Sequence, residues 1–347
     1  MRAVVFSETG PSSVLHLVDR DVPEPGPGEV RVRIVCSGVN PTDWKSRQGA
    51  TGAGMAFPEI VPNQDGSGIV DSVGSGVDGF TVGDRVWVML AAHQRPTGTA
   101  QELTVLPAER VLPLSDAAGF DLGASLGVPA LTAHRALTTS EDGPDRLSPG
   151  ALAGTTVLVA GGAGAVGNAA IQLAVWAGAT VVTTISSDEK AALARSAGAH
   201  QVVNYQLGDT VAQIREIAPD GVDIVVEVSP AQNLGLDLAV IRPRGTIAVY
   251  ANNGGDEVTF QVRETFSTNV RLQFVLLYGV GDKALRSAAE DVNAAIADGA
   301  FGVGEDHGVP LHHFPLERTA AAHEAVEAGA VGKVLIDVTG AEQPPGQ

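Results

Sequence analysis

The sequence has almost no cysteine and no long apolar run, and both absences narrow its class. Among 347 residues the one cysteine is Cys36. A single thiol excludes an intrachain disulfide, a four-cysteine zinc site and a cysteine-ligated iron–sulfur cluster built from one chain. No segment reaches the ~18 uninterrupted apolar residues of a membrane span, and the N-terminal MRAVVFSETG is too short in its apolar part for a signal peptide. We therefore expect a cytoplasmic protein in a reducing compartment.

Positive charge is also scarce. The sequence has 22 Lys and Arg against 40 Asp and Glu, which gives a formal net charge of -18. This charge repels nucleic-acid phosphates and anionic membrane surfaces, so we expect neither as a partner. Hydrophobic residues make up 44% and charged residues 18%, a balance typical of a globular α/β enzyme. At roughly 150 residues per domain, the length predicts two domains.

The chain up to about residue 127 consists of short runs in which apolar and polar residues alternate between Gly, Asp and Pro. Examples are Val30–Ile34, Ile69–Val73 and Arg85–Met89. Alternation favours half-buried strands, so this part predicts an antiparallel β domain.

From about residue 128 the pattern changes to apolar runs separated by helix-like segments. Such runs are typical of strands buried on both faces, and their alternation with helices predicts a doubly wound parallel sheet. The expected fold class is therefore α/β. The expected strands are Thr155–Ala160, Val181–Ile185, Val202–Asn204, Asp223–Val228, Thr246–Ala251 and Leu272–Leu277, and the expected helices are Val166–Ala177, Asp188–Ala197, Thr210–Ile217 and Leu234–Val240.

The last segment returns to mixed character. It contains two amphipathic helices, Lys283–Ala297 and Leu316–Ala328, and a strand at Val334–Val338, followed by a polar tail over residues 341–347 that we expect to be frayed. We expect this segment to pack back on the first domain. The predicted domains are therefore residues 1–127 with 278–347, and residues 128–277.

A glycine-rich turn, GGAGAVG, follows the strand TTVLVA and precedes a helix. Its cofactor-binding candidates are Gly161, Gly164, Ala165, Val166 and Gly167. Glycines at this spacing let the backbone turn tightly and approach a pyrophosphate, whose charge then lies against the helix N-terminus. The strand and helix around the motif favour a dinucleotide site over a tight turn with no ligand.

The end of the second strand, TTISSDEK, predicts which dinucleotide binds. NAD enzymes place Asp or Glu there for the ribose 2′-hydroxyl, whereas this sequence has Ser186 and Ser187, with Lys190 one helical turn later. Hydroxyl donors and a cation suit a 2′-phosphate, so NADPH is favoured. Two other interpretations stay open: Ser186 and Glu189 also fit a capping box, and Asp188 could serve a ribose.

Further segments occur in a recognisable order: GVNPTDWKSRQG (Gly38–Gly49), PNQDGSGIVDSVGSGVDGFTVGDRVW (Pro62–Trp87), LTAHRAL (Leu131–Leu137), VLVAGGAGAVGNAAIQLA (Val157–Ala174), NY (Asn204–Tyr205) and VGKVLIDV (Val331–Val338). Together they resemble the zinc-independent quinone oxidoreductase (zeta-crystallin-like) branch of the medium-chain dehydrogenase/reductase superfamily, over almost the whole chain.

This resemblance implies a GroES-like substrate domain made from both ends of the chain, a Rossmann NADPH-binding domain between them, and an active site in the cleft. It implies that Ser187, Lys190 and Tyr205 hold the adenosine phosphate. Tyr205 taken alone is typical of a half-buried aromatic residue at a strand end.

The same resemblance predicts that no metal takes part. Zinc-dependent relatives have Cys at the position of Asn40, His at that of Gln64 and a third Cys near Val128. Side-chain amides are poor zinc ligands beside thiolate and imidazole. The cysteines of the structural zinc lobe are missing as well.

The implied reaction is hydride transfer from NADPH to a quinone or another α,β-unsaturated carbonyl, which places negative charge on an oxygen. Asn40 could donate its amide to that oxygen, and Lys45 could supply a cation or a proton. Lys45 taken alone is as well explained as a solvated lysine on a short helix. The pattern Asp43–Trp44–Lys45 is similar to that of enone reductases in the family, whereas many of its quinone reductases have Tyr in place of Lys45.

Two alternatives stay open: an enoyl reductase that acts on a thioester or a pathway intermediate, and a nucleotide-binding protein of low turnover. The resemblance also implies a homodimer joined by the sixth strands of two Rossmann sheets. The segment RLQFVLL (Arg271–Leu277) is an apolar edge strand that needs such cover.

Overall fold

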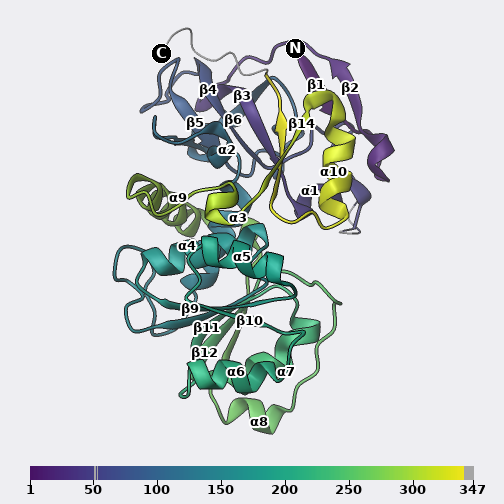
Figure 1. Ribbon diagram of the computed structural model, residues 1–347. Coiled ribbons are helices and arrows are strands. Elements are labelled where there is room, and N and C mark those ends of the chain that lie inside the picture. Colours follow the sequence, from purple (N-terminus) through teal and green to yellow (C-terminus); the bar gives the residue numbers. More distant parts are fainter. Residues whose placement is uncertain (51, 53, 340–347) are drawn as a thin grey trace. The chain divides into compact units, whose positions relative to one another are not determined.

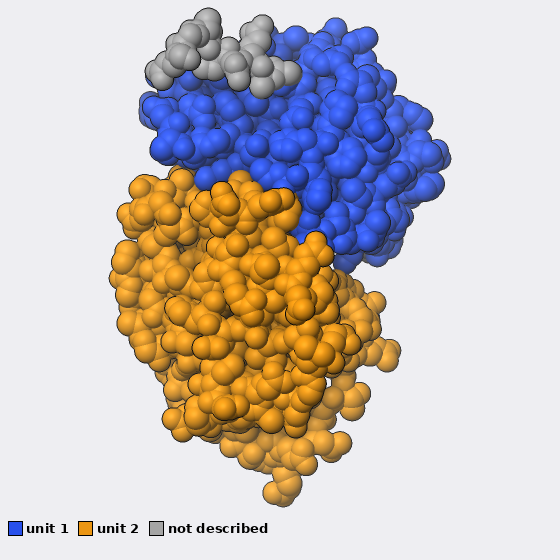
Figure 2. Space-filling model, in the orientation of Figure 1, with its two compact units in different colours: residues 1–128, 311–347 blue, residues 129–310 orange. Residues whose placement is uncertain are grey.

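The computed structural model describes residues 1–50, 52 and 54–339, which Figure 1 traces from end to end. They form two compact units. Unit 1 is residues 1–128 with the segment that begins at residue 311, and unit 2 is residues 129–310 (blue and orange in Figure 2). The predicted tail, residues 341–347, lies outside the described residues.

Unit 1 is built on a mostly antiparallel sheet, as the alternating runs predict. Its strand order is β14-β15-β3-β4-β5-β7, and β6 pairs with β3 outside this path. The last strand runs antiparallel to β3, with Val334 opposite Val39, so the end of the chain returns to the first domain as expected. The strands are β3 (Glu29–Val39), β4 (Asp65–Val73), β5 (Arg85–Val88), β6 (Leu103–Pro107), β7 (Val111–Pro113), β14 (Leu311–Pro315) and β15 (Lys333–Asp337), beside a separate pair, β1 (Arg2–Val5) and β2 (His16–Asp19).

The core of unit 1 explains the alternation. Val30, Val32 and Ile34 of β3 are fully buried in one apolar cluster with residues of the other strands. Strand β3 leads directly into α1 (Pro41–Gln48), whose N-cap is Asn40; the Asn40 N–H donates to the side chain of Asp43. Helix α10 (Thr319–Glu327) packs against α1 and β15, and α2 (Phe120–Gly123) packs against β4.

Unit 2 is a six-stranded parallel sheet in the order β10-β9-β8-β11-β12-β13. This confirms the predicted doubly wound α/β fold. Strand β12 begins at Ile241, before the expected start at Thr246. Its early residues Arg242–Arg244 are exposed and form no apolar run, so the sequence pattern does not indicate this part of the strand. The strands are β8 (Thr156–Ala160), β9 (Thr180–Ile185), β10 (Gln201–Asn204), β11 (Val222–Glu227), β12 (Ile241–Val249) and β13 (Arg271–Phe274).

Helices cover both faces of this sheet (Figure 1). Helices α4 (Ala165–Trp176) and α5 (Asp188–Ser196) lie on one side, and α6 (Thr210–Ile217) and α7 (Pro230–Val240) lie on the other. The remaining helices are α3 (Gly127–Leu137), α8 (Val262–Phe266) and α9 (Asp282–Ala297). Among the described residues, no helix has the length and apolar character needed to cross a bilayer.

The domain boundary needs one correction. Residues 278–310, which the sequence assigns to the first domain, belong to unit 2. The reason is the position of α9, which packs on α4 and whose buried Asp291 accepts hydrogen bonds from His134 Nε2, Arg146 Nε and the Leu147 N–H, each at 2.8 Å. An amphipathic pattern shows that a helix packs on a core, but it does not show which core.

Candidate functional site

The glycine-rich turn of unit 2 has the backbone that a dinucleotide site needs. Strand β8 ends at Ala160, Gly161 turns the chain at φ +70°, and Gly164 is the N-cap of α4. A Cβ on Gly167 would lie 2.4 Å from the Gly161 carbonyl oxygen, so the helix approaches the strand only because position 167 has no side chain. The N–H groups of Ala165, Val166 and Gly167 open the helix and lack intrahelical acceptors, as the first N–H groups of any α-helix do.

The predicted adenosine-phosphate residues gather at the end of the neighbouring strand β9. The Lys190 Nζ donates to Ser186 Oγ at 3.1 Å, and Ser187 Oγ accepts from the Lys190 N–H at 3.3 Å. Tyr205 follows β10 with 48% of its surface exposed and donates its backbone N–H to the Ile185 carbonyl. The structure therefore brings Ser186, Ser187 and Lys190 together, and their role toward a cofactor stays a prediction.

One interpretation of this segment is wrong. The N-cap of α5 is Ser187, not Ser186, so Ser186 and Glu189 form no capping box. The cap lies one residue later because Ser187 has the extended backbone of an N-cap and accepts the helical N–H of Lys190. The Ser186 hydroxyl therefore does not cap the helix and instead accepts from the Lys190 ammonium.

In unit 1 the candidate Asn40 is part of a buried charged network. Asn40 Nδ2 donates to Asp65 Oδ2 at 2.7 Å, and Asn40 Oδ1 accepts from the Lys333 Nζ at 2.6 Å. The same ammonium lies 3.4 Å from Asp65 Oδ2, and the Val128 N–H donates to Asp65 Oδ1 at 2.8 Å. Lys333 and Asp65 have side-chain exposures of 2% and 0%. Asn40 is thus held at both ends of its amide.

A second carboxyl group, Asp43, belongs to the same network. Its Oδ2 accepts the Asn40 N–H at 2.7 Å, and the residue is buried. Burial raises the pKa of Asp43 to about 8, helped by the negative charge of Asp65, while the positive charge of Lys333 opposes the shift. Asp43 is therefore neutral at pH 7. Burial also raises the pKa of Asp65, and the Lys333 charge and the hydrogen bonds from Asn40 and the Val128 N–H oppose that shift.

The second catalytic candidate, Lys45, lies on α1 and is half-buried. Its Nζ is 5.8 Å from the centre of the Trp44 ring, a cation–π distance. The part of Lys45 in chemistry stays a prediction.

Three buried groups were missed from the sequence. The burial of Lys333 has no signal within VGKVLIDV, because an isolated lysine predicts exposure. His323 of α10 donates from Nε2 to Asn63 Oδ1 at 2.9 Å, and burial, with the charge of Arg47, lowers the pKa of His323 to about 3. Glu227, buried at the end of β11, lies beside Asp237 of α7, and burial raises the pKa of both. Nothing local in the sequence marks these partners.

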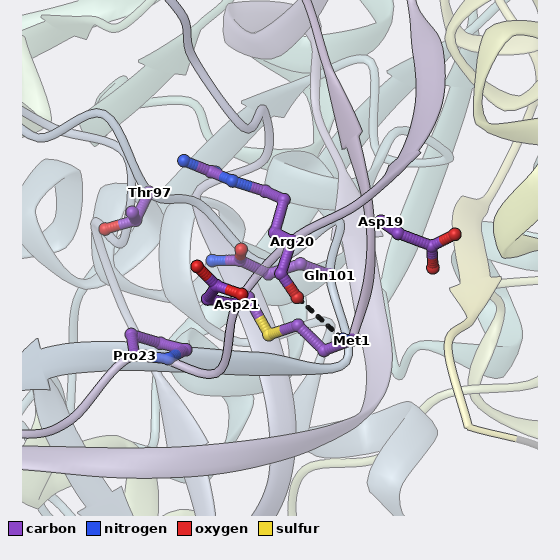
Figure 3. Close-up of a pocket in the computed structure, with 7 residues that line it drawn as sticks. All are labelled: Met1, Asp19, Arg20, Asp21, Pro23, Thr97 and Gln101. Carbon is purple, nitrogen blue, oxygen red and sulfur yellow. Dashed lines mark hydrogen bonds between the residues drawn. The ribbon is translucent and has the colours of Figure 1, made fainter.

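A pocket of about 520 Å³ lies elsewhere in unit 1 (Figure 3). It contains none of the predicted site residues, and the amine of Met1 bonds the Arg20 carbonyl oxygen beside it at 2.8 Å. Its lining is Met1, Asp19, Arg20, Asp21, Pro23, Thr97 and Gln101.

Comparison with known proteins gives matches over nearly the whole chain. Residues 26–116 match the alcohol dehydrogenase GroES-like domain, and residues 165–294 match the zinc-binding dehydrogenase model. The chain is 32% identical to a quinone oxidoreductase of Rattus norvegicus, with 97% of each chain covered, and 31% identical to a 2-haloacrylate reductase of a Burkholderia species, with 93% and 94% covered. The structure of an Escherichia coli quinone oxidoreductase complexed with NADPH aligns with a TM-score of 0.80 at 25% identity, covering 97% of this chain and 100% of that one.

The zinc in the name of one matched family does not fit the residues present. Asn40 and Gln64 stand where the resemblance places zinc ligands, the chain has no Cys near Val128, and the Asn40 amide is already bonded to Asp65 and Lys333. Within residues 1–50, 52 and 54–339, no group of three His, Cys, Asp or Glu side chains could hold a metal ion. An ammonium beside the amide would also repel a cation. We derive no chemistry through zinc.

The neutral Asp43 predicts a specific pH dependence of stability. In the unfolded chain an aspartate loses its proton near pH 4, whereas folded Asp43 keeps it up to about pH 8. The folded state binds more protons between these values, so the free energy of unfolding falls as pH rises, by at most about 1.4 kcal/mol per pH unit. Asp43→Asn copies the neutral acid and still accepts the Asn40 N–H, so it should flatten this decline in urea unfolding from about pH 5 to about pH 8.

Asp78→Asn, at an exposed position of unit 1, is the matched control and should keep the wild-type slope. Parallel stability curves for wild type and Asp43→Asn would show that Asp43 is ionised in the folded protein.

Proposed function

We propose that this chain, which belongs to the quinone oxidoreductase family of the medium-chain dehydrogenase/reductase superfamily, transfers a hydride from NADPH to a quinone or another α,β-unsaturated carbonyl without a metal. The observation that carries the proposal is the Asn40–Asp65–Lys333 network. In it the Asn40 amide, held by Asp65 and Lys333, stands where zinc-dependent relatives have a cysteine ligand, in a chain that keeps the dinucleotide turn of unit 2. The relatives named above support it through the quinone and NADPH in their names.

Unit 2 would hold the cofactor by two kinds of contact. The opening N–H groups of α4 would face the pyrophosphate, and Gly161 and Gly167 would let the backbone come close to it. The Ser186 and Ser187 hydroxyls and the Lys190 ammonium would bind a 2′-phosphate, with Tyr205 beside them. When bound, NADPH supplies the hydride.

Unit 1 would stabilise the acceptor's carbonyl oxygen, on which negative charge develops during hydride transfer. Asn40 has a second Nδ2 hydrogen beyond the one given to Asp65, and a donor fixed in place lowers the barrier for a developing oxyanion. Lys45 would supply a positive charge, and the acceptor takes up one proton to become the hydroquinone or the saturated carbonyl. Asp43, being neutral, adds no opposing charge to this region.

One observation favours a second candidate, an enoyl reductase with a specific substrate. The 2-haloacrylate reductase among the relatives is named for an α,β-unsaturated acid, so its substrate is closer to an enoyl compound than to a quinone. Both reactions need the same donors and the same cofactor. The third interpretation, a nucleotide-binding protein of low turnover, predicts binding without turnover.

The single cysteine remains consistent with a cytoplasmic location, which we also propose.

The proposal is tested by NADPH oxidation at 340 nm with purified protein, a chelator and, in parallel, a small para-quinone, a simple enone and an enoyl thioester. We expect turnover of at least one acceptor at an unchanged rate with chelator, because the donors are protein groups. A rate that is lost with chelator and restored by zinc, or NADPH binding with no turnover of any acceptor, would contradict it.

Lys190 provides the test of cofactor choice. Lys190→Ala removes the cation proposed for the 2′-phosphate, and a hydrogen bond to a charged group contributes about 1.5–3 kcal/mol, so the KM for NADPH should rise about 10–100-fold while that for NADH stays the same. Lys283→Ala, at an exposed lysine at the start of α9, should change neither. Equal effects of Lys190→Ala on both cofactors would mean that the lysine does not recognise the phosphate.

We also propose that two copies of the chain pair through β13. This strand ends the six-stranded sheet, so its outer edge has no strand beside it within the described chain. Phe274, the last residue of β13, and Leu276, just after it, are 63% and 68% exposed. An exposed apolar edge strand associates with another strand unless it is covered, and a two-fold dimer covers both edges at once.

Sedimentation equilibrium tests this interface. The wild type should have twice the mass of the chain, and Phe274→Lys with Leu276→Lys should shift it to the monomer, because two buried charges would face each other across the edge. Val82→Lys, at an apolar residue of unit 1 that is 69% exposed, is the control and should remain dimeric. A monomeric wild type would exclude the interface.

A further inference from the structure

Lys333 is the least expected residue of the unit 1 network. It is the first residue of β15, and its ammonium is buried with 2% of the side chain exposed. The closest oxygen is not the carboxylate: Nζ lies 2.6 Å from Asn40 Oδ1 and 3.4 Å from Asp65 Oδ2. The ammonium is thus closer to the Asn40 amide than to its counterion Asp65.

This contact determines which way the Asn40 amide faces. An ammonium can only donate hydrogen bonds, so the atom beside it must be the amide oxygen. The Nδ2 group then points to Asp65, to which it gives one hydrogen at 2.7 Å. The second hydrogen of Nδ2 remains for another acceptor. With the amide reversed, an oxygen would take its place and repel a negatively charged acceptor.

We propose that Lys333 is a positioning residue that fixes the Asn40 amide with its N–H group available to the oxygen of the acceptor. This inference rests on the proposed function and adds a residue to it. Asp65 alone cannot fix the Asn40 amide. Without Lys333, the Asp65 carboxylate would still accept from Nδ2 of Asn40, but Oδ1 of Asn40 would have no hydrogen-bond donor. The positive charge of Lys333 also opposes the effect of burial, which raises the pKa of Asp65.

The ion pair has no evident purpose as a source of stability. Replacing a buried ion pair by apolar or neutral groups of similar volume is often neutral or stabilising, whereas removing one partner leaves an uncompensated charge and is strongly destabilising. A positioning role and a merely structural role of Lys333 can therefore be told apart. If Lys333 is only structural, turnover should follow stability across the variants; if it positions Asn40, turnover should stay low where stability recovers.

The experiment compares Asp65→Asn with the double variant Lys333→Met, Asp65→Asn. Thermal unfolding and kcat with the best acceptor are measured for both. Asp65→Asn leaves the ammonium on Asn40 but without a counterion, so it should be less stable than wild type and lose at most a few-fold in kcat. The double variant removes both charges, so it should regain stability and yet have a kcat at least about 10-fold below that of Asp65→Asn, because loss of one oxyanion donor costs about 100–1,000-fold.

The KM for NADPH should stay the same in every variant, since the proposed cofactor contacts belong to unit 2. The control is Arg31→Met with Asp71→Asn, which removes the partly buried pair between β3 and β4, whose Nε–Oδ2 distance is 2.7 Å. It should leave kcat unchanged. A kcat of the double variant that recovers together with its stability would overturn the proposal. If this variant does not fold, Lys333→Leu in the same background provides a second apolar replacement.

A second measurement does not depend on turnover. In protein labelled with ¹⁵N-asparagine, with the Asn40 signals assigned by Asn40→Ala, the Nδ2 hydrogens should exchange with solvent at least about 10-fold faster in the double variant than in Asp65→Asn. An unchanged exchange rate would overturn the inference whatever the enzyme reduces. A wild type that reduces no acceptor, with the exchange difference present, would refute the proposed function and leave the positioning of Asn40 standing.

Discussion

The buried carboxylate of Asp65 is the constraint on which unit 1 depends. A charge removed from water must be matched by donors on every side, and those donors come from the N-cap of α1, the start of β15 and the start of α3. Each donor belongs to a different part of the chain, so the carboxylate fixes where these three elements meet. The site that we propose for the acceptor is therefore a consequence of satisfying one charge.

The two units reach their chemistry by different means. Unit 2 uses backbone groups at the end of β8 and side chains within five residues at the end of β9, so its candidate site is local in the sequence. Unit 1 uses side chains that are far apart, because Asn40 and Lys333 are separated by 293 positions. This difference explains why the dinucleotide turn could be predicted with its glycines, whereas the partner of Asn40 could not.

Sequence patterns predicted most of the strands, the parallel sheet and the return of the last strand to the first domain, because burial of alternate or continuous apolar residues determines the strands. They did not predict the position of α9. Its apolar face fits either core, and the choice depends on the bonds of Asp291 to His134 and Arg146. The N-cap of α5 was misplaced by one residue for a similar reason, since Ser186 and Ser187 have the same chemistry and only the backbone distinguishes them.

Pairs of buried acids with raised pKa values recur in both units. Asp43 lies beside Asp65 in unit 1, and Asp237 lies beside Glu227 in unit 2, where Glu227 also accepts the N–H of Ser229 and the amide of Asn233. In each pair burial and the neighbouring negative charge raise the pKa of the second carboxyl group, because ionising two adjacent carboxyl groups out of water is costly. Glu227 ends β11 as Asp65 begins β4, so each pair joins a strand end to a helix. An acidic protein can thus place carboxyl groups inside its framework at neutral pH without adding to the repulsion of its net charge of -18.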